Sequence, residues 1–373
     1  MPSVLFSPLD IGPIAAPNRI AIAPMCQYSA NDGCASDWHL QLAMNYGMSG
    51  AGTVVLEATG VTREGRISHG DLGLYSDACE YALGRVLHAA RAVALPGTRF
   101  GIQLAHAGRK ASTHVNWMGS GPLGPNESAW RTVAPSAIPY AADGKWHVPA
   151  AMDEDEIRAT IEAFAQAAKR AARLGFDIIE IHAAHGYLIH EFHSPISNTR
   201  TDEWGGDADR RLRFPLAVAE AVRAATPGRI AVGARITGTD YLEGGLTVDD
   251  AVRFSRELKT RGYDFVCVSS GNIVAGGRPA SGPGFNVPNA AKVRKEAGIV
   301  VRTAGLIAEP RQAEEIVARQ GVDQIAIARA QIDDPRWGWH AAEKLGHKLE
   351  LPPQMRRVSV GTWPGASLAR PQG

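Results

Sequence analysis

Short apolar segments alternate with longer amphipathic ones along most of the 373-residue chain. Eight of the apolar segments have the character of buried strands. They cover residues 20–23, 53–56, 100–104, 178–181, 230–234, 265–268, 299–301 and 324–327. Helical patterning follows them and is clearest over 153–174 and 248–261, where acidic residues mark the first turn. Eight strand–helix units predict an α/β fold and favour a closed (β/α)8 TIM barrel. An open doubly wound sheet is the alternative, because periodicity alone does not order buried strands, but no GxGxxG motif follows an early strand.

One connection is too long for an ordinary loop between a strand and a helix. From His106 to about Ala150 the chain is rich in Gly, Pro and Ser and contains three tryptophans. Long loops of this kind are often lids or binding elements, so we expect an ordered cap at the barrel mouth after the third strand. We expect residues 1–350 to form one barrel domain. The proline-containing tail, residues 351–373, is expected to contact a neighbouring subunit.

Composition narrows the class of protein. Lys plus Arg (39) nearly balances Asp plus Glu (38), so neither nucleic acid nor an anionic membrane is indicated as a partner. The N-terminus lacks a signal-peptide pattern, and no apolar run reaches the roughly 18 residues of a membrane span, so a cytoplasmic protein is expected. The four cysteines form no CxxC pair, so we expect reduced thiols rather than an iron–sulfur or zinc site.

The candidate chemistry centres on His182, His185 and Tyr187, which directly follow the predicted strand 178–181. Ligands of parallel α/β folds bind at the carboxyl ends of strands. Two imidazoles could hold a carbonyl oxygen while a phenol delivers a proton to a neighbouring carbon. A metal-dependent hydrolase built on His182 and His185 is the rival, although HxxH lacks the spacing and the glutamate of HExxH. Buried structural histidines are a further alternative.

Other strand ends also carry functional groups. Gly305 and Arg329 follow strands seven and eight, where barrels often bind phosphate, although a glycine turn and a surface arginine would look the same. Arg235 closes a buried strand and must meet an anion, electron-rich atoms or a salt-bridge partner. Gln103 needs a hydrogen-bond partner such as a ring amide. Cys26, at the first strand end, is either a functional or a buried thiol.

These motifs resemble the Old Yellow Enzyme family of FMN-dependent ene-reductases, in particular its xenobiotic-reductase and thermophilic-like branch. The resemblance runs from Leu5 to at least Arg357. Its motifs are Asn18-Arg19-Ile20, Ala23-Pro24-Met25-Cys26-Gln27-Tyr28, Glu57-Ala58-Thr59, Gln103-Leu104-Ala105-His106-Ala107-Gly108-Arg109-Lys110 and His182-Ala183-Ala184-His185-Gly186-Tyr187.

The resemblance implies an NADPH dehydrogenase with non-covalent FMN at the barrel mouth. NADPH or NADH would reduce the flavin, and an α,β-unsaturated carbonyl compound or a nitro xenobiotic would then reoxidise it in a ping-pong reaction. It assigns the flavin ring to Ala23, Pro24, Met25, Cys26, Ala58, Gln103 and Arg235. It assigns the phosphate to Ala304, Gly305, Ala328 and Arg329, although family members usually have glycine at the position of Ala328.

The resemblance also implies a substrate site, with Tyr187 as the proton donor and Cys26 tuning the flavin potential. Substrate would contact Tyr28, His182, His185 and Tyr187. Trp337 is also expected among the substrate-binding residues, with a place in the core as the alternative. In a homodimer or homotetramer, Arg357 from the tail would enter the neighbouring subunit's site, although the tail beyond Val358 does not match the family. A ligand-binding barrel without turnover is a third class of function.

Overall fold

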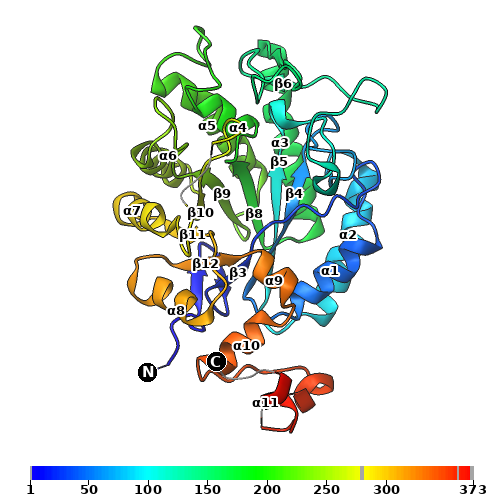
Figure 1. Cartoon of the computed structure of the whole chain (residues 1–373), viewed down its shortest axis with the longest axis vertical. Coiled ribbons are helices and arrows are strands. Elements are labelled where there is room, and N and C mark those ends of the chain that lie inside the picture. Colours follow the sequence, from blue (N-terminus) through cyan, green and yellow to red (C-terminus); the bar gives the residue numbers. More distant parts are fainter. Residues whose placement is uncertain (1, 278–280, 359–360, 370–373) are drawn as a thin grey trace.

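The structure, a computed structural model, describes residues 2–277, 281–358 and 361–369, and its centre is a closed barrel of eight parallel strands (Figure 1). The barrel strands are β3 (Ile20–Ile22), β4 (Thr53–Gly60), β5 (Arg99–Ala105), β8 (Ile178–Ala183), β9 (Ala231–Thr237), β10 (Phe265–Ser269), β11 (Val300–Thr303) and β12 (Gln324–Ile327). They are paired in chain order, and β12 pairs with β3 to close the ring. All eight predicted strands are therefore confirmed, and the open-sheet alternative is excluded.

Helices surround the barrel, as Figure 1 shows. The longer ones are α1 (Asp37–Gly47), α2 (Asp77–Val93), α3 (Glu154–Leu174), α5 (Ala208–Ala225), α6 (Val248–Thr260), α7 (Val287–Ala297), α8 (Pro310–Arg319) and α10 (Trp337–Lys344). The shorter ones are α4 (Leu188–His193), α9 (Arg329–Asp333) and α11 (Ala366–Ala369). The acidic residues predicted at helix starts act as caps, since Asp153 and Glu156 form a capping box at α3. Both predicted helices are found within one residue of their expected bounds.

A short hairpin closes the base of the barrel. Strands β1 (Leu9–Ile11) and β2 (Ile14–Ala16) pair antiparallel, and their buried side chains pack against Ile178, Ala231 and Phe265. These three residues lie at the starts of β8, β9 and β10, so the hairpin covers the amino-terminal ends of the strands. The hydrophobic pattern did not predict it, because each strand is three residues long with an exposed residue in the middle, whereas the equally short β3 is buried throughout.

A ladder of buried polar side chains crosses the barrel interior. Gln103 Nε2 donates to Glu180 Oε1 at 2.7 Å, and Arg302 Nη1 lies 3.3 Å from Glu180 Oε2. Arg302 Nε donates to Gln324 Oε1 at 2.7 Å, and Gln324 Nε2 donates to Thr53 Oγ1 at 3.1 Å. The five residues come from five different strands, and each is at most 2% exposed. The buried carboxylate and guanidinium are thereby paired with each other, as buried charges must be, while Arg302 Nη2 has no hydrogen-bond partner among the described residues.

The long connection after β5 is an ordered cap, as predicted. It contains 3₁₀ turns at Gly108–Lys110 and Asn116–Met118 and the short strands β6 (Val133–Ala134) and β7 (Ala150–Ala151), which pair parallel. Trp130 Nε1 donates to Glu64 O at 2.9 Å, which ties the cap to the segment after β4. Figure 1 shows the cap, coloured cyan to green, at one end of the molecule, and α11 at the opposite end.

The tail lies on the α2 side of the barrel. Residues 351–356 line a groove together with residues 92–94 at the end of α2 and with Met48, and Pro353–Val358 form a 3₁₀ helix. The division at residue 350 stays a prediction. All four cysteines are free thiols in the structure, with 3.8 Å between Cys34 Sγ and Cys79 Sγ. None of the helices in the described part of the chain is long and apolar enough to span a membrane.

Candidate active site

The end of β8 brings two imidazoles and a phenol together. The His182 ring centroid lies 5.1 Å from that of His185 and 4.8 Å from that of Tyr187, and both pairs are nearly perpendicular. One boundary differs from the prediction, because β8 continues to Ala183 and His182 is paired with Arg235 inside the sheet. The histidine therefore belongs to the strand itself rather than following it, which fixes its backbone more firmly than a loop would.

Both histidines are neutral at this site. Burial, together with the positive charge of Arg235, lowers their pKa well below the ordinary value. The amide of Ala184 donates to His182 Nδ1 at 3.3 Å, so the ring carries its proton on Nε2. His185 Nε2 lies 2.7 Å from Ser269 Oγ. Burial also raises the pKa of Tyr187 well above its ordinary value, so the phenol keeps its proton. The three side chains are thus neutral groups that carry hydrogen-bond donors.

The turn after β8 has an unusual backbone. His185 and Gly186 both have left-handed conformations, with φ of 60° and 71°. A Cβ at Gly186 would lie 2.3 Å from the carbonyl oxygen of Asn272, so only glycine fits there. Lys110 Nζ donates to His185 O at 2.8 Å and lies 5.0 Å from the Tyr187 ring centroid. Burial lowers the pKa of Lys110 to about 8.

A second cluster forms where β3 and β4 end. Cys26, Glu57 and Asp71 have ligand atoms within 4.8 Å of one another. Burial and the two nearby carboxylates raise the pKa of Cys26 well above its ordinary value, so the thiol keeps its proton. Burial raises the pKa of Asp71 to about 7. Tyr28 lies beside this cluster, and its ring meets that of Trp117 from the cap edge-on at 5.8 Å.

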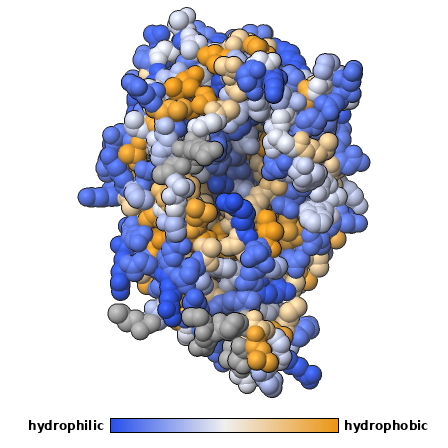
Figure 2. Space-filling model, viewed as in Figure 1, coloured by the Kyte–Doolittle hydropathy of each residue, from blue (hydrophilic) through white to orange (hydrophobic). Residues whose placement is uncertain are grey.

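A hollow opens beside these residues, and its lining comes from both the barrel and the cap. Cys26, Tyr28, Trp38, Asn116 and Trp117 are among the lining residues. Figure 2 shows that the molecule is hollowed near the middle of the face seen there, where Figure 1 shows the barrel. The predicted cap therefore contributes to the wall of the candidate site.

A metal site at the two histidines finds no support in the part of the chain that the structure describes. The one group of three or more His, Cys, Asp or Glu side chains with ligand atoms close enough to share an ion there is Cys26, Glu57 and Asp71. It includes neither His182 nor His185. The hydrolase alternative therefore lacks the ligand set that it needs.

Arg235 lies inside β9 rather than at its end, because this strand continues to Thr237. Its Nε is buried without a hydrogen-bond partner, and no carboxylate of the described residues forms an ion pair with it. A structural salt bridge therefore does not explain this arginine. Gln103, in contrast, has a protein partner, because its Nε2 donates to Glu180. An unpaired guanidinium facing two neutral imidazoles fits the electron-rich edge of a flavin ring.

The ends of β11 and β12 fit a phosphate group. Ala304 and Ala328 pack on a cluster of small residues, namely Ala21 in β3, Ala23 directly after it and Ala326 in β12. Gly305 has φ of 142°, and a Cβ there would lie 2.9 Å from the Phe285 ring. Arg329, the first residue of α9, is exposed. Small side chains, a glycine and an arginine leave room for close approach by an anion, so these residues fit FMN.

Two predicted site residues lie elsewhere in this chain. Trp337 is 5% exposed, belongs to the main hydrophobic core and donates from Nε1 to Ala308 O at 2.6 Å. These contacts favour the core alternative, and a contact of Trp337 with substrate stays a prediction. Arg357 is exposed in the Pro353–Val358 turn, next to the residues that line the groove beside α2. Within one chain it is not brought to the mouth of the barrel.

Sequence reasoning missed several residues that support the site. Glu180 and Arg302 are charged residues within apolar strands, and that contrast was the signal for the buried ladder. Asp71 gave no local signal, because it comes from the loop between β4 and α2 and reaches Cys26 only through the fold.

The fold and this site define a class of protein. A closed (β/α)8 barrel with proton donors, a free guanidinium and a phosphate-sized cradle at the strand ends is a TIM-barrel enzyme with its site at the mouth. The chain matches the model of the NADH:flavin oxidoreductase / NADH oxidase family over residues 4–348. It belongs to this family, the Old Yellow Enzyme family.

Individual relatives agree. The chain is 41% identical to an NADPH dehydrogenase of Listeria innocua over 358 residues, which cover 95% of this chain and 99% of that protein. It is 40% identical to an NADPH dehydrogenase of Geobacillus thermodenitrificans, over 96% of this chain and 99% of that one. Among solved structures, morphinone reductase in complex with tetrahydroNAD has a TM-score of 0.73 at 28% identity, covering 94% and 93% of the two chains. The protein is thus an FMN-dependent oxidoreductase that takes its electrons from a nicotinamide.

Proposed function

We propose that this enzyme is an ene-reductase, which reduces the C=C bond of α,β-unsaturated carbonyl compounds with NADPH or NADH. The observation that carries the proposal is the triad of His182, His185 and Tyr187, in which a second neutral imidazole and a protonated phenol lie 5.1 and 4.8 Å from the His182 ring centroid. One substrate would therefore meet a pair of donors and a proton source together.

Each side chain has a separate task in this proposal. FMN bound at the mouth supplies the two-electron chemistry, in which hydride from the nicotinamide is passed to the β-carbon of the alkene. His182 and His185 donate hydrogen bonds to the carbonyl oxygen, where negative charge grows, and such donors contribute roughly 3 kcal/mol each. Tyr187 delivers the proton to the α-carbon. The overall balance is alkene plus NAD(P)H plus H⁺, giving the saturated product and NAD(P)⁺.

The cofactor contacts follow from the fit described above. Arg235 faces the electron-rich edge of the flavin ring, and Gln103 and Ala58 lie along neighbouring strands. The segment from Ala23 to Cys26 provides the opposite wall, and Ala304, Gly305, Ala328 and Arg329 hold the phosphate. Tyr28 and Cys26 contact the substrate. An unsaturated carbonyl compound is the preferred substrate class, with nitro xenobiotics second.

The sharpest test separates the two half-reactions. Tyr187→Phe should slow alkene reduction by roughly 10²-fold or more, because proton delivery is lost. Reduction of the bound flavin by NADPH should stay within about two-fold, since that step needs no proton from Tyr187. Stopped-flow absorbance of the holoenzyme measures both rates. Equal losses in both half-reactions would reject Tyr187 as the proton donor.

Tyr263→Phe is the matched control for Tyr187→Phe. Its hydroxyl donates to Ala219 O at 3.1 Å between α5 and β10, away from the triad, so neither half-reaction should change. The same preparation tests the remaining class. A ligand-binding barrel without turnover would hold FMN but would not oxidise NADPH in the presence of an enone.

A further part of the proposal concerns assembly. We place Arg357 in the neighbouring subunit's site within a homodimer or homotetramer, because its exposed position leaves the side chain free to reach another chain. This part stands apart from the chemistry of the triad, which lies within one chain.

A further inference from the structure

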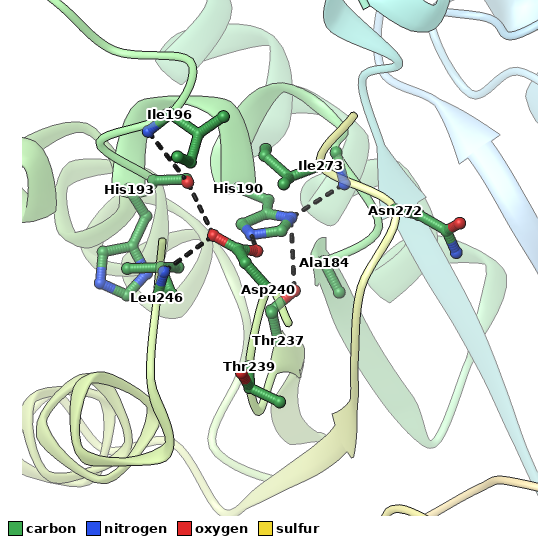
Figure 3. Close-up of polar contacts among 12 residues, drawn as sticks. Ala184, His190, His193, Ile196, Thr237, Thr239, Asp240, Leu246, Asn272 and Ile273 are labelled. Carbon is green, nitrogen blue, oxygen red and sulfur yellow. Dashed lines mark hydrogen bonds and ion pairs between the residues drawn. The ribbon is translucent and has the colours of Figure 1, made fainter. Parts of the chain in front are cut away.

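Next to the turn that carries His185 and Tyr187 lies a third imidazole, paired with a carboxylate. His190 Nε2 lies 2.9 Å from Asp240 Oδ1, and both side chains are fully buried. His190 is in α4. Asp240 lies in the segment after β9, and α5 separates the two residues in the sequence. Figure 3 shows the two side chains pointing toward each other, with Thr237 and Leu246 close by.

The hydrogen bonds define which nitrogen of His190 carries the proton. The backbone N–H of Gly186 donates to His190 Nδ1 at 2.8 Å, and an amide N–H cannot accept. Nδ1 is therefore the acceptor, so the ring proton is on Nε2, the nitrogen that lies 2.9 Å from Asp240 Oδ1. Thr237 Oγ1, which lies 3.3 Å from Nδ1, is then restricted to donating.

Asp240 is held from its other side. Its Oδ2 accepts from Ser194 Oγ at 2.8 Å and from the Leu246 amide at 2.9 Å. Burial alone would raise the pKa of this carboxyl, but His190 and these donors outweigh burial and bring the pKa below its ordinary value. The carboxylate is thus ionised and fixes the tautomer of His190, as second-shell carboxylates fix histidines elsewhere.

The Gly186 amide is a sensitive point in the site. Gly186 is the residue between His185 and Tyr187. Both His185 and Gly186 have left-handed backbone conformations, and this conformation costs free energy for a residue such as histidine. A buried amide without a partner would add the cost of an unsatisfied donor. The bond to His190 therefore stabilises the one turn conformation that directs both side chains to the mouth.

We propose that His190 and Asp240 are a positioning pair, which sets the turn Ala184–Tyr187 in the conformation that presents His185 and Tyr187. The proposal rests on the proposed function for what those two residues do to a substrate. Its structural half, the tautomer and the anchored amide, stands independently of that function. Neither His190 nor Asp240 touches the substrate in this scheme.

Two conservative variants of His190 distinguish a role in positioning the turn from a role that only provides Asp240 with a hydrogen-bond donor. His190→Asn keeps an acceptor where Nδ1 was and loses the donor to Asp240. His190→Gln keeps a donor where Nε2 was and loses the acceptor for Gly186. If the pair positions the turn, Asn preserves the site better than Gln. If His190 serves only to satisfy Asp240, Gln preserves the protein better.

The experiment uses FMN-loaded protein and two readouts. Hydrogen–deuterium exchange of the peptide that contains Gly186 reports the anchor directly, without activity. Binding of p-hydroxybenzaldehyde, followed by the long-wavelength absorbance of the flavin–phenolate complex, reports the presentation of His185 and Tyr187. We expect His190→Gln to speed exchange and weaken phenol binding by about 10–100-fold, and His190→Asn by about three-fold or less. NADPH reduction of the flavin should stay within about two-fold in both.

The outcomes are decisive in each direction. The proposal is supported if the Gly186 amide exchanges faster in His190→Gln than in His190→Asn and if His190→Gln also binds the phenol more weakly. Equal exchange in both variants, or the opposite order, overturns it. ¹⁵N chemical shifts of wild-type His190 add a test that needs no variant, and a proton on Nδ1 overturns the proposal. If exchange follows the expected order but the wild type reduces no enone, the proposed function fails and the positioning pair stands.

Discussion

The base and the mouth of the barrel bury the two ends of the same strands but differ in what covers them. At the base, the hairpin β1–β2 places apolar side chains on Ile178, Ala231 and Phe265. At the mouth, buried and half-buried imidazoles, carboxyls, a thiol and an unpaired guanidinium gather around the strand ends. Apolar burial stabilises a fold directly, whereas buried ionisable groups cost free energy that function must justify. The base therefore contributes to the stability of the fold, whereas the groups needed for chemistry at the mouth lower it.

The largest expected effect comes from removing both donors at the mouth. In His182→Ala/His185→Ala, alkene reduction should fall by on the order of 10⁴-fold, because each donor to a developing oxyanion is worth about 10²-fold or more. Thermal unfolding should change little, since the two imidazoles are neutral and polar. Steady-state kinetics with cyclohexenone, beside a melting curve, checks both. A large loss of stability with full activity would reverse the contrast between the two ends.

The base should respond in the opposite way. Ile11 is fully buried in the hairpin, and Ile11→Ala should lower the free energy of unfolding by about 2–5 kcal/mol through lost burial and a residual cavity. The rates of both half-reactions, measured well below the unfolding transition, should match the wild type. Urea titration gives the stability. A change in the half-reaction rates with unaltered stability would show that the base is coupled to the mouth.

The mouth should also carry a pH dependence that the base lacks. Burial raises the pKa of Glu191 to about 8, whereas an unfolded glutamate titrates near 4.3. Between these pH values the folded protein keeps a proton that the unfolded chain releases, so wild-type stability falls as pH rises toward 8. Glu191→Gln lacks this component and can still accept from the Arg109 amide.

The free energy of unfolding of Glu191→Gln should therefore increase relative to that of the wild type as the pH rises, by up to about 1.4 kcal/mol per pH unit. Urea titrations at pH 5, 6.5 and 8 measure the difference. Ile11→Ala is the control, and its difference from the wild type should be the same at all three pH values. Parallel curves for Glu191→Gln would contradict a raised pKa at this position.

The smallest expected effect concerns the tail. If Arg357 enters the neighbouring site, Arg357→Ala should raise the KM for an enone by about three-fold, as expected for a partly exposed charged contact. The adjacent Arg356→Ala is the matched control and should leave KM unchanged. Sedimentation velocity shows whether the variant keeps its oligomeric state. An unchanged KM in an intact oligomer would remove Arg357 from the site.

The barrel could be predicted from the sequence because its strands are buried on both faces, so that segments such as 20–23 and 265–268 form continuous apolar runs. The same apolar pattern predicted carboxyl-terminal strand ends that lie before the ends found in the structure. Glu57, His182 and Arg235 are polar, yet they lie within β4, β8 and β9. At the mouth of a barrel, polar residues belong to the strands themselves, so an apolar run stops before the hydrogen-bonded ladder does.

The contacts between distant segments lay beyond such reasoning. His182, His185 and Tyr187 could be brought into one hypothesis because they directly follow the predicted strand 178–181 and are close in sequence as well as in space. Asp240 meets His190 from 50 residues away, and no local pattern marks that partnership. Trp337 could not be assigned from the sequence either, because a tryptophan suits a core and a pocket equally. The hydrogen bond from its Nε1 to Ala308 O is visible only in the structure.

The ladder that runs from Gln103 through Glu180, Arg302 and Gln324 to Thr53 has a consequence for anyone who remodels this enzyme. It is a charge-neutral layer of buried side chains across the barrel interior, joined by three hydrogen bonds and one ion pair. Changes made above and below it should combine almost additively in free energy. Variants selected for new substrates can then be paired with independently stabilised lower halves, without a fresh search for compatible combinations.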